Sequence, residues 1–286
     1  MFLAVTFTGV SAVGIWWALT GDITDEADQL RYGGLAMFTP TLGMLAAAAA
    51  SGTLRRPKEL LASTGMLVSG RWSTILRYCA IGVLLPLVIL AATLGISVLL
   101  GEYHLRQPLP WGELTMTVAM SVLTFVPALV LVLGEELGWG YLLPRLLPLG
   151  LWPGLLLAGL LWGLFHAPLT LQGYGYPDQN GLVATLMFTV AHVLLGTLMG
   201  WIRLASGSVW PAVALHGASN MLANPIPAVI GQTADPARLG QYAAVPTAWP
   251  SWFVLAALIG ILACRGHYRR PFDHIRHGAD QPQRFE

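Results

Sequence analysis

Two adjacent glutamates, Glu135 and Glu136, lie within the otherwise apolar run VLVLGEELGWGYLL. An ionisable residue inside a bilayer costs about 2.5–3.5 kcal/mol on insertion scales, so an intramembrane carboxylate is a candidate functional residue. Neighbouring residues of an α-helix point about 100° apart around its axis. We therefore expect the two carboxylates to face different partners and to have different roles.

Three histidines follow in later apolar runs: His166, His192 and His216. Asn220 comes four residues after His216, which places both on one helix face. A carboxylate such as Glu135 beside an imidazole can activate water as a general base, and a second imidazole with a carboxamide can donate hydrogen bonds to a developing oxyanion. This combination suits amide hydrolysis. For His192 we expect packing or a hydrogen bond to the backbone, with a place in the lining of the site as the alternative.

The same groups leave a second chemistry open. Glu135, His166 and His216 could form a two-histidine, one-carboxylate site for a divalent metal such as zinc. The spacing does not decide between a bound metal and no cofactor. No HExxH helix and no G-x-S-x-G turn is present, so the common zinc-protease and serine-hydrolase signatures are absent. A transporter or proton relay could use these groups too, but no inverted repeat supports one.

The amino-acid composition indicates the environment in which these residues lie. Of 286 residues, 55% are apolar and 10% are charged, whereas a soluble domain carries about 25% charge. With 15 basic against 14 acidic residues, the chain lacks the basic excess of a nucleic-acid-binding protein. Two cysteines are too few for a disulfide framework. The sequence predicts an all-α polytopic membrane helix bundle, forming a single membrane domain over 1–286.

Apolar runs of about 20 residues can cross the hydrocarbon core as helices. Eight runs are predicted to do so: 2–20, 34–51, 76–100, 115–143, 152–172, 183–202, 209–226 and 251–265. With the N-terminus inside, twelve basic residues fall in cytoplasmic segments and three, Arg31, Arg106 and Arg238, fall outside. This asymmetry follows the positive-inside rule. Both termini are therefore expected in the cytoplasm, the C-terminal one as a polar tail over 266–286.

Three segments between about 115 and 225 resemble the CPBP family of intramembrane proteases, also called the CaaX protease and bacteriocin-processing (Abi) family. The paired glutamates begin Glu135-Glu136-Leu-Gly-Trp-Gly140, which is similar to the family's first motif. Trp162-Gly-Leu-Phe-His166 resembles its second motif, an aromatic residue followed by three residues and a histidine. His216-Gly-Ala-Ser-Asn220 resembles its third. The motifs occur in the family's order, on three separate predicted helices.

The resemblance implies an intramembrane endopeptidase. Carried over by position, Glu135 and His166 would activate the attacking water, and His216 and Asn220 would form the oxyanion hole. Glu136 would have a structural role. The family is labelled metalloprotease, yet a metal-free glutamate mechanism fits these residues equally well. The implied substrate is a membrane-embedded or membrane-tethered protein, or a lipidated peptide, which could be a prenylated CaaX chain. We expect a multi-pass plasma-membrane protein surrounded by lipid, with its site opening toward the cytoplasm.

One position departs from the family pattern. The first motif places an arginine four residues after Glu136, and this sequence has Gly140 there. Arg145 is a poor substitute, because on a continuous helix it lies on the opposite face, about 13 Å farther along the axis. The departure keeps an alternative open, in which the chain is a catalytically degenerate bacteriocin-immunity or peptide-binding membrane protein.

Overall fold

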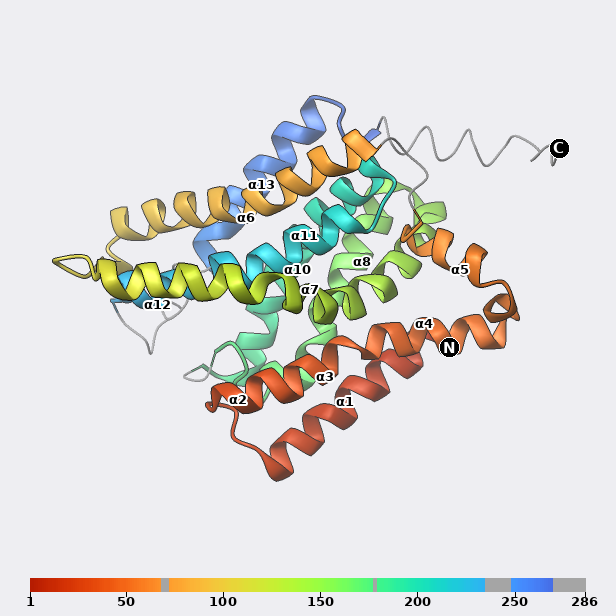
Figure 1. The fold of residues 1–286 in the computed structure, drawn as a ribbon, viewed down its shortest axis with the longest axis horizontal. Coiled ribbons are helices and arrows are strands. Elements are labelled where there is room, and N and C mark those ends of the chain that lie inside the picture. Colours follow the sequence, from red (N-terminus) through yellow and green to blue (C-terminus); the bar gives the residue numbers. More distant parts are fainter. Residues whose placement is uncertain (68–71, 177–178, 235–247, 270–286) are drawn as a thin grey trace.

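The computed structural model describes residues 1–67, 72–176, 179–234 and 248–269. Helices dominate these residues, and the two short strands pair only with each other (Figure 1). The all-α membrane bundle expected from the sequence is therefore confirmed. The first half of the chain forms α1 (Phe2–Thr20), α2 (Glu26–Asp28), a π-helical turn (Gln29–Gly33), α3 (Gly34–Met37), α4 (Thr39–Ala50), a 3-10 turn (Thr53–Arg55), α5 (Pro57–Thr64), α6 (Trp72–Leu99) and β1 (Tyr103–Leu105).

The second half carries the three motifs. Its elements are α7 (Trp111–Leu146), a 3-10 turn (Leu147–Leu149), α8 (Leu151–Phe165), α9 (Ala167–Thr170), α10 (Gly181–Ser206), α11 (Trp210–Ala218), a π-helical turn (Ser219–Ala223), α12 (Pro225–Ile230), β2 (Gly231–Thr233) and α13 (Trp249–Cys264).

Six helical segments within the described ranges are long and apolar enough to cross a bilayer: Phe2–Thr20, Gln29–Ala50, Trp72–Leu99, Trp111–Leu149, Leu151–Thr170 and Gly181–Ser206. The other two expected spans are helical but do not meet that standard. The run 209–226 is divided between α11, a π-helical turn and α12, which begins at Pro225. The run 251–265 falls mainly within α13, whose 16 residues extend about 24 Å, less than the hydrocarbon thickness of about 30 Å.

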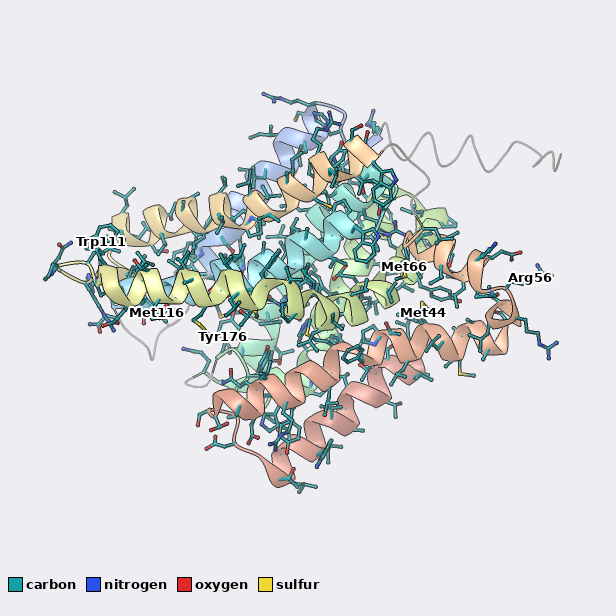
Figure 2. The ribbon with its side chains drawn as sticks, in the orientation of Figure 1. Met44, Arg56, Met66, Trp111, Met116 and Tyr176 are labelled. Carbon is teal, nitrogen blue, oxygen red and sulfur yellow. The ribbon has the colours of Figure 1, made fainter. Side chains whose placement is uncertain are left out.

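Successive helices run back and forth between two ends of the bundle (Figure 1). The Met1 end holds Met1, residues 51–65, residues 207–209 and Arg265, and there the Val209 amide donates to the Gly65 carbonyl at 2.9 Å. The Trp111 end holds residues 21–28, 100–110, 171–176 and 231–234, and there β1 pairs antiparallel with β2. Figure 2 shows Arg56 and Trp111 at these opposite ends.

This arrangement places the N-terminus and the end of α13 on the same side, as the even number of expected crossings requires. Which side faces the cytoplasm stays a prediction from the basic residues. Some of the residues on which that prediction rests lie outside the described residues. They are Arg71, Arg238 and residues 270–286, which make up most of the expected tail.

The 36 residues of α7 have two different surroundings. Apolar side chains such as Leu123, Val126 and Val130 are exposed on its first half, as lipid-facing residues would be. From Val132 onward the helix enters the bundle, where Glu135 is 1% exposed and Glu136 is 4% exposed. The carboxylates thus lie where α7 changes from a lipid-facing to a protein-facing helix.

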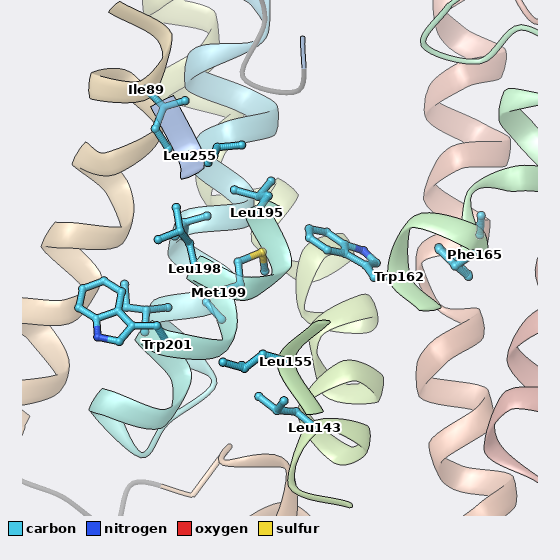
Figure 3. Packing of buried hydrophobic residues seen from close by; sticks show 14 of the residues in the cluster. Ile89, Leu143, Leu155, Trp162, Phe165, Leu195, Leu198, Met199, Trp201 and Leu255 are labelled. Atoms are coloured by element: carbon cyan, nitrogen blue, oxygen red, sulfur yellow. The ribbon is translucent and has the colours of Figure 1, made fainter. Parts of the chain in front are cut away.

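Close packing of α8 on α10 brings His166 and His192 together, and side chains of α8 and α10 form the main core with others from α1, α6, α7, α11 and α13 (Figure 3). Glycines allow this approach, since a Cβ at Gly159 would lie 2.7 Å from the Val193 Cα. A Cβ at Gly163 would lie 2.6 Å from the Thr189 Cα. Small residues at such contacts let membrane helices pack backbone to backbone.

We predict that Gly163→Ala lowers the melting temperature of the detergent-solubilised protein. The added methyl group would force α8 away from α10, and overpacking of this kind typically costs about 1–3 kcal/mol. The matched control is Gly95→Ala on α6, where an added Cβ meets nothing within 4 Å. That control should be neutral or slightly stabilising, because alanine favours helix over glycine. Equal melting temperatures for the two variants would contradict the packing described.

Candidate active site

A cavity of about 470 Å³ lies inside the bundle, and all four predicted catalytic side chains reach it. Glu135 comes from α7, His166 from the α8–α9 junction, His216 from α11 and Asn220 from the following π-helical turn. The wall also includes His192, Trp162, Phe188, Tyr174, Ser219 and Asn224. Residues spread over 90 positions of sequence are thereby brought to one cavity.

Two indole groups hold the Glu135 carboxylate. Its Oε1 accepts a hydrogen bond from Trp139 Nε1 at 3.2 Å, one helical turn away, and a second from Trp162 Nε1 on α8. Two N–H donors stabilise the ionised form of a buried carboxylate and fix its orientation. Within the described chain, no hydrogen bond connects Glu135 with His166. The two side chains face the same cavity, with room between them for water.

The backbone fixes the orientation of His166. Its Nδ1 lies 2.9 Å from the Trp162 carbonyl oxygen, which can only accept, so Nδ1 carries the hydrogen. In the neutral ring Nε2 is then the basic nitrogen. His166 is also the C-terminal capping residue of α8, immediately before α9 begins. Nε2, the basic nitrogen, is therefore the ring nitrogen that does not bond to the backbone of α8.

His192 forms the hydrogen bond to the backbone that the sequence led us to expect, from Nδ1 to the Phe188 carbonyl at 2.7 Å. Its ring stacks on Phe188 with centroids 4.2 Å apart and lies 4.6 Å from the His166 ring. The side chain thus packs in the cavity wall while lining the cavity beside a predicted catalytic residue.

The second carboxylate, Glu136, faces away from Glu135 and pairs with His216. The His216 Nδ1 lies 2.9 Å from the Glu136 Oε1, and both side chains are buried. The divergent roles expected of adjacent glutamates are therefore visible in their partners, two indoles for Glu135 and an imidazole for Glu136. Glu136 thus contacts a residue of the predicted oxyanion hole, and its structural role stays a prediction.

Near Gly140 the structure places a buried arginine from α10. Arg203 Nη2 donates to the Gly140 carbonyl at 3.3 Å and to the Ser63 carbonyl at 3.5 Å. Arg145 turns elsewhere, donating to the Tyr141 carbonyl with its guanidinium 3.3 Å above the Tyr141 ring. Arg203 is one of the twelve basic residues expected in cytoplasmic segments, yet it is buried, at 8% exposed, which the sequence did not predict.

Two further polar residues of the cavity wall, Asn224 and Tyr174, were not predicted from the sequence. The Asn224 Oδ1 is buried and has no hydrogen-bond partner among the described residues. Its position four residues after Asn220, on the same helical face, was an available signal. Tyr174 lies outside the spanning helices, and burial together with the negative charge of Glu135 raises the pKa of its phenol. Tyr174 is therefore neutral and can donate a hydrogen bond.

The donor set does not fit a metal centre as the side chains are placed. In the described part of the chain, no three His, Cys, Asp or Glu side chains converge as metal ligands would. Glu135 is engaged by two indoles, and the carboxylate that meets His216 is Glu136. The geometry that a Glu135, His166 and His216 site requires is therefore not formed.

The cavity extends toward the Trp111 end of the bundle. Its lining includes Leu30, which is 67% exposed, together with Gly33 and the segment 174–176. The basic residues predict that this end faces outward, away from the cytoplasm. Both the cytoplasmic N-terminus and the opening of the site toward the cytoplasm stay predictions.

We predict energetic coupling between Glu136 and His216 in the free energy of unfolding in detergent. Glu136→Gln or His216→Asn alone leaves a buried polar partner poorly satisfied, so the double variant should be more stable than additivity predicts. The coupling should be about 0.5–3 kcal/mol. Glu113→Gln, which weakens only the exposed Arg106 pair, should cost about 0–1 kcal/mol. Additive effects at Glu136 and His216 would show that the pair contributes nothing.

Comparison with known families gives one match, over residues 117–222, to the family model described as type II CAAX prenyl endopeptidase, Rce1-like. None of the curated proteins compared with the chain matches it. The matched segment runs from α7 to the π-helical turn after α11 and contains Glu135, His166, His216 and Asn220. The resemblance seen in the three motifs is confirmed, because the segment that carries them is similar to the Rce1-like type II CAAX prenyl endopeptidase family.

Proposed function

We propose that this protein is an intramembrane endopeptidase that hydrolyses a peptide bond with a water activated by Glu135 and His166. One observation carries the proposal: Glu135, His166, His216 and Asn220 line a single buried cavity within the segment that matches the endopeptidase family. A cavity within a membrane bundle limits water access, which strengthens electrostatic interactions with the reacting groups.

The attacking water would sit between Glu135 and the Nε2 of His166. Because Trp139 and Trp162 both donate to Oε1 of Glu135, its Oε2 is left to accept the proton of the water. His166 Nε2 is the second acceptor. As the water attacks the scissile carbonyl, one proton moves to this pair, and it is later delivered to the leaving amine.

The developing oxyanion would be stabilised from α11 and the turn that follows it. His216 is held by Glu136 through Nδ1, so donation from Nε2 uses the doubly protonated ring, which the adjacent carboxylate stabilises. The Asn220 carboxamide is the second donor, one helical turn away. Asn224 lies on the same wall, and its Oδ1, which has no partner among the described residues, would accept a hydrogen bond from the substrate backbone. No step passes through a metal ion.

The family description names CAAX prenyl endopeptidases, so we propose a membrane-tethered, prenylated CaaX chain as the substrate class. A CaaX chain carries its prenyl group on the cysteine of the C-terminal tetrapeptide, which holds the scissile region near the bilayer. We also propose a plasma-membrane location. The alternative of a degenerate, peptide-binding protein rests on Gly140, and it predicts binding without cleavage.

Cleavage of a farnesylated CaaX peptide by the protein in lipid vesicles should depend on Glu135. We expect Glu135→Gln to reduce kcat by about 10²–10⁴-fold, the range for loss of a general base. Glu113→Gln makes the same chemical change on the exposed part of α7 and should cleave like wild type. Mass spectrometry of the peptide products measures both, and a chelator added to parallel samples reports any metal requirement. Equal cleavage by wild type and Glu135→Gln would refute the mechanism.

Removing either carboxamide of the cavity wall should affect the reaction more than the fold. For Asn220→Ala we expect kcat to fall by about 10²–10³-fold, as when one oxyanion donor is lost. Asn224→Ala should mainly raise KM. Asn180→Ala is the control, since Asn180 caps α10 by accepting from the Leu182 amide at 3.0 Å and is predicted to alter stability alone. Unchanged kcat in Asn220→Ala would remove Asn220 from the oxyanion hole.

A further inference from the structure

Arg203 occupies a slot that two glycines leave open. Gly65 has a φ of +76°, in the left-handed region that favours glycine, and a Cβ there would lie 2.0 Å from Arg203 Nη1. A Cβ at Gly140 would lie 3.4 Å from Arg203 Nε and 2.8 Å from the Thr64 carbonyl oxygen. The guanidinium is therefore enclosed by backbone from α5 and α7, although its own helix is α10.

The charge of Arg203 is incompletely satisfied by these contacts. Nη2 has the Ser63 and Gly140 carbonyls as acceptors, whereas the buried Nε–H has no partner among the described residues. A buried cation without a counter-charge is strongly destabilising. A nearby anion is therefore needed to compensate the charge of Arg203.

Glu136 is that anion. Arg203 and Glu136 interact electrostatically and line the same small cavity, of about 40 Å³, together with Trp139, Gly140 and Trp162. The wall of this cavity is mostly apolar, with Glu136 and Arg203 as its charged members, and its volume is large enough to hold at least one water molecule. A water there can accept from Arg203 Nε and donate to the Glu136 carboxylate, which satisfies both groups.

We propose that Arg203 is a positioning residue for the site, supplying from α10 the positive charge that the family motif places at position 140 on α7. Glycine at 140 and arginine at 203 are then complementary, since the missing side chain makes room for the incoming one. The inference rests on the proposed function, because Arg203 acts on the reaction through Glu136 and His216. It does not touch the reacting atoms.

The first test reads the Glu136–His216 contact without any substrate. Histidines are labelled with ¹⁵N, and the ring signal of His216 is assigned by its loss in His216→Asn. We expect Arg203→Met to shift this signal toward its position in Glu136→Gln, and Arg203→Lys to shift it less. Arg145→Met is the matched control, because Arg145 stacks on Tyr141 and should leave the signal unchanged. An unchanged His216 signal in Arg203→Met would overturn the proposal.

The second test uses cleavage and protects against a simple folding defect. Arg203→Met should lower kcat by about 100-fold or more, as expected for breaking a buried charge pair, with little change in KM. In a Glu136→Gln background, Arg203→Met should cause no further loss. An independent, additive loss in the Glu136→Gln and Arg203→Met pair would overturn the proposal.

The two tests also separate this inference from the proposed function. If wild type cleaves nothing while the His216 signal responds to Arg203→Met, the positioning role stands and the endopeptidase assignment fails. If cleavage depends on Glu135 while neither the signal nor kcat responds to Arg203→Met, the endopeptidase assignment stands and the role of Arg203 is wrong.

Discussion

Burying two adjacent carboxylates in an apolar bundle is the constraint on which the rest of this structure depends. Each buried ion loses its hydration and must be compensated by hydrogen bonds or opposite charge. Because helix geometry turns Glu135 and Glu136 away from each other, they need separate sets of partners. Two indoles serve Glu135, and His216 serves Glu136. These partners come from α7, α8 and α11, so meeting the constraint also assembles the cavity.

Such partners can reach α7 only if the helices approach closely. Glycines on α8 bring its backbone against α10, and this contact places Trp162 beside His192 with ring centroids 4.4 Å apart. Gly65 and Gly140 also lack side chains, and this leaves the space that the Arg203 guanidinium fills. Packing and electrostatics are thus coupled at Arg203, since two glycines leave the space that its buried guanidinium occupies.

The sequence predicted what depends on local pattern. Apolar runs indicated the helices, and the three motifs indicated four residues that line one cavity. The hydrogen bond of His192 to the backbone was also foreseen. Contacts between helices distant in sequence could not be predicted from local pattern. Nothing in the sequence around Arg203 indicates that its side chain turns inward to Gly140.

Two further differences have physical reasons of their own. A hydropathy pattern reports how apolar a run is, yet it does not report helix breaks such as the π-helical turn that divides 209–226. The direction in which a cavity extends depends on which loops cover it. Here the lining reaches the exposed Leu30 near the Trp111 end, and basic-residue counts carry no information about that.

The proposal that Glu135 makes this membrane bundle a protease can be tested directly without knowing the substrate. Wild type and Glu135→Gln are expressed at equal levels in membranes of a strain lacking the protein, and the N- and C-termini of all membrane-associated proteins are mapped by mass spectrometry. The account predicts a set of termini present with wild type and absent with Glu135→Gln. Identical termini in both samples would contradict it and favour a peptide-binding protein.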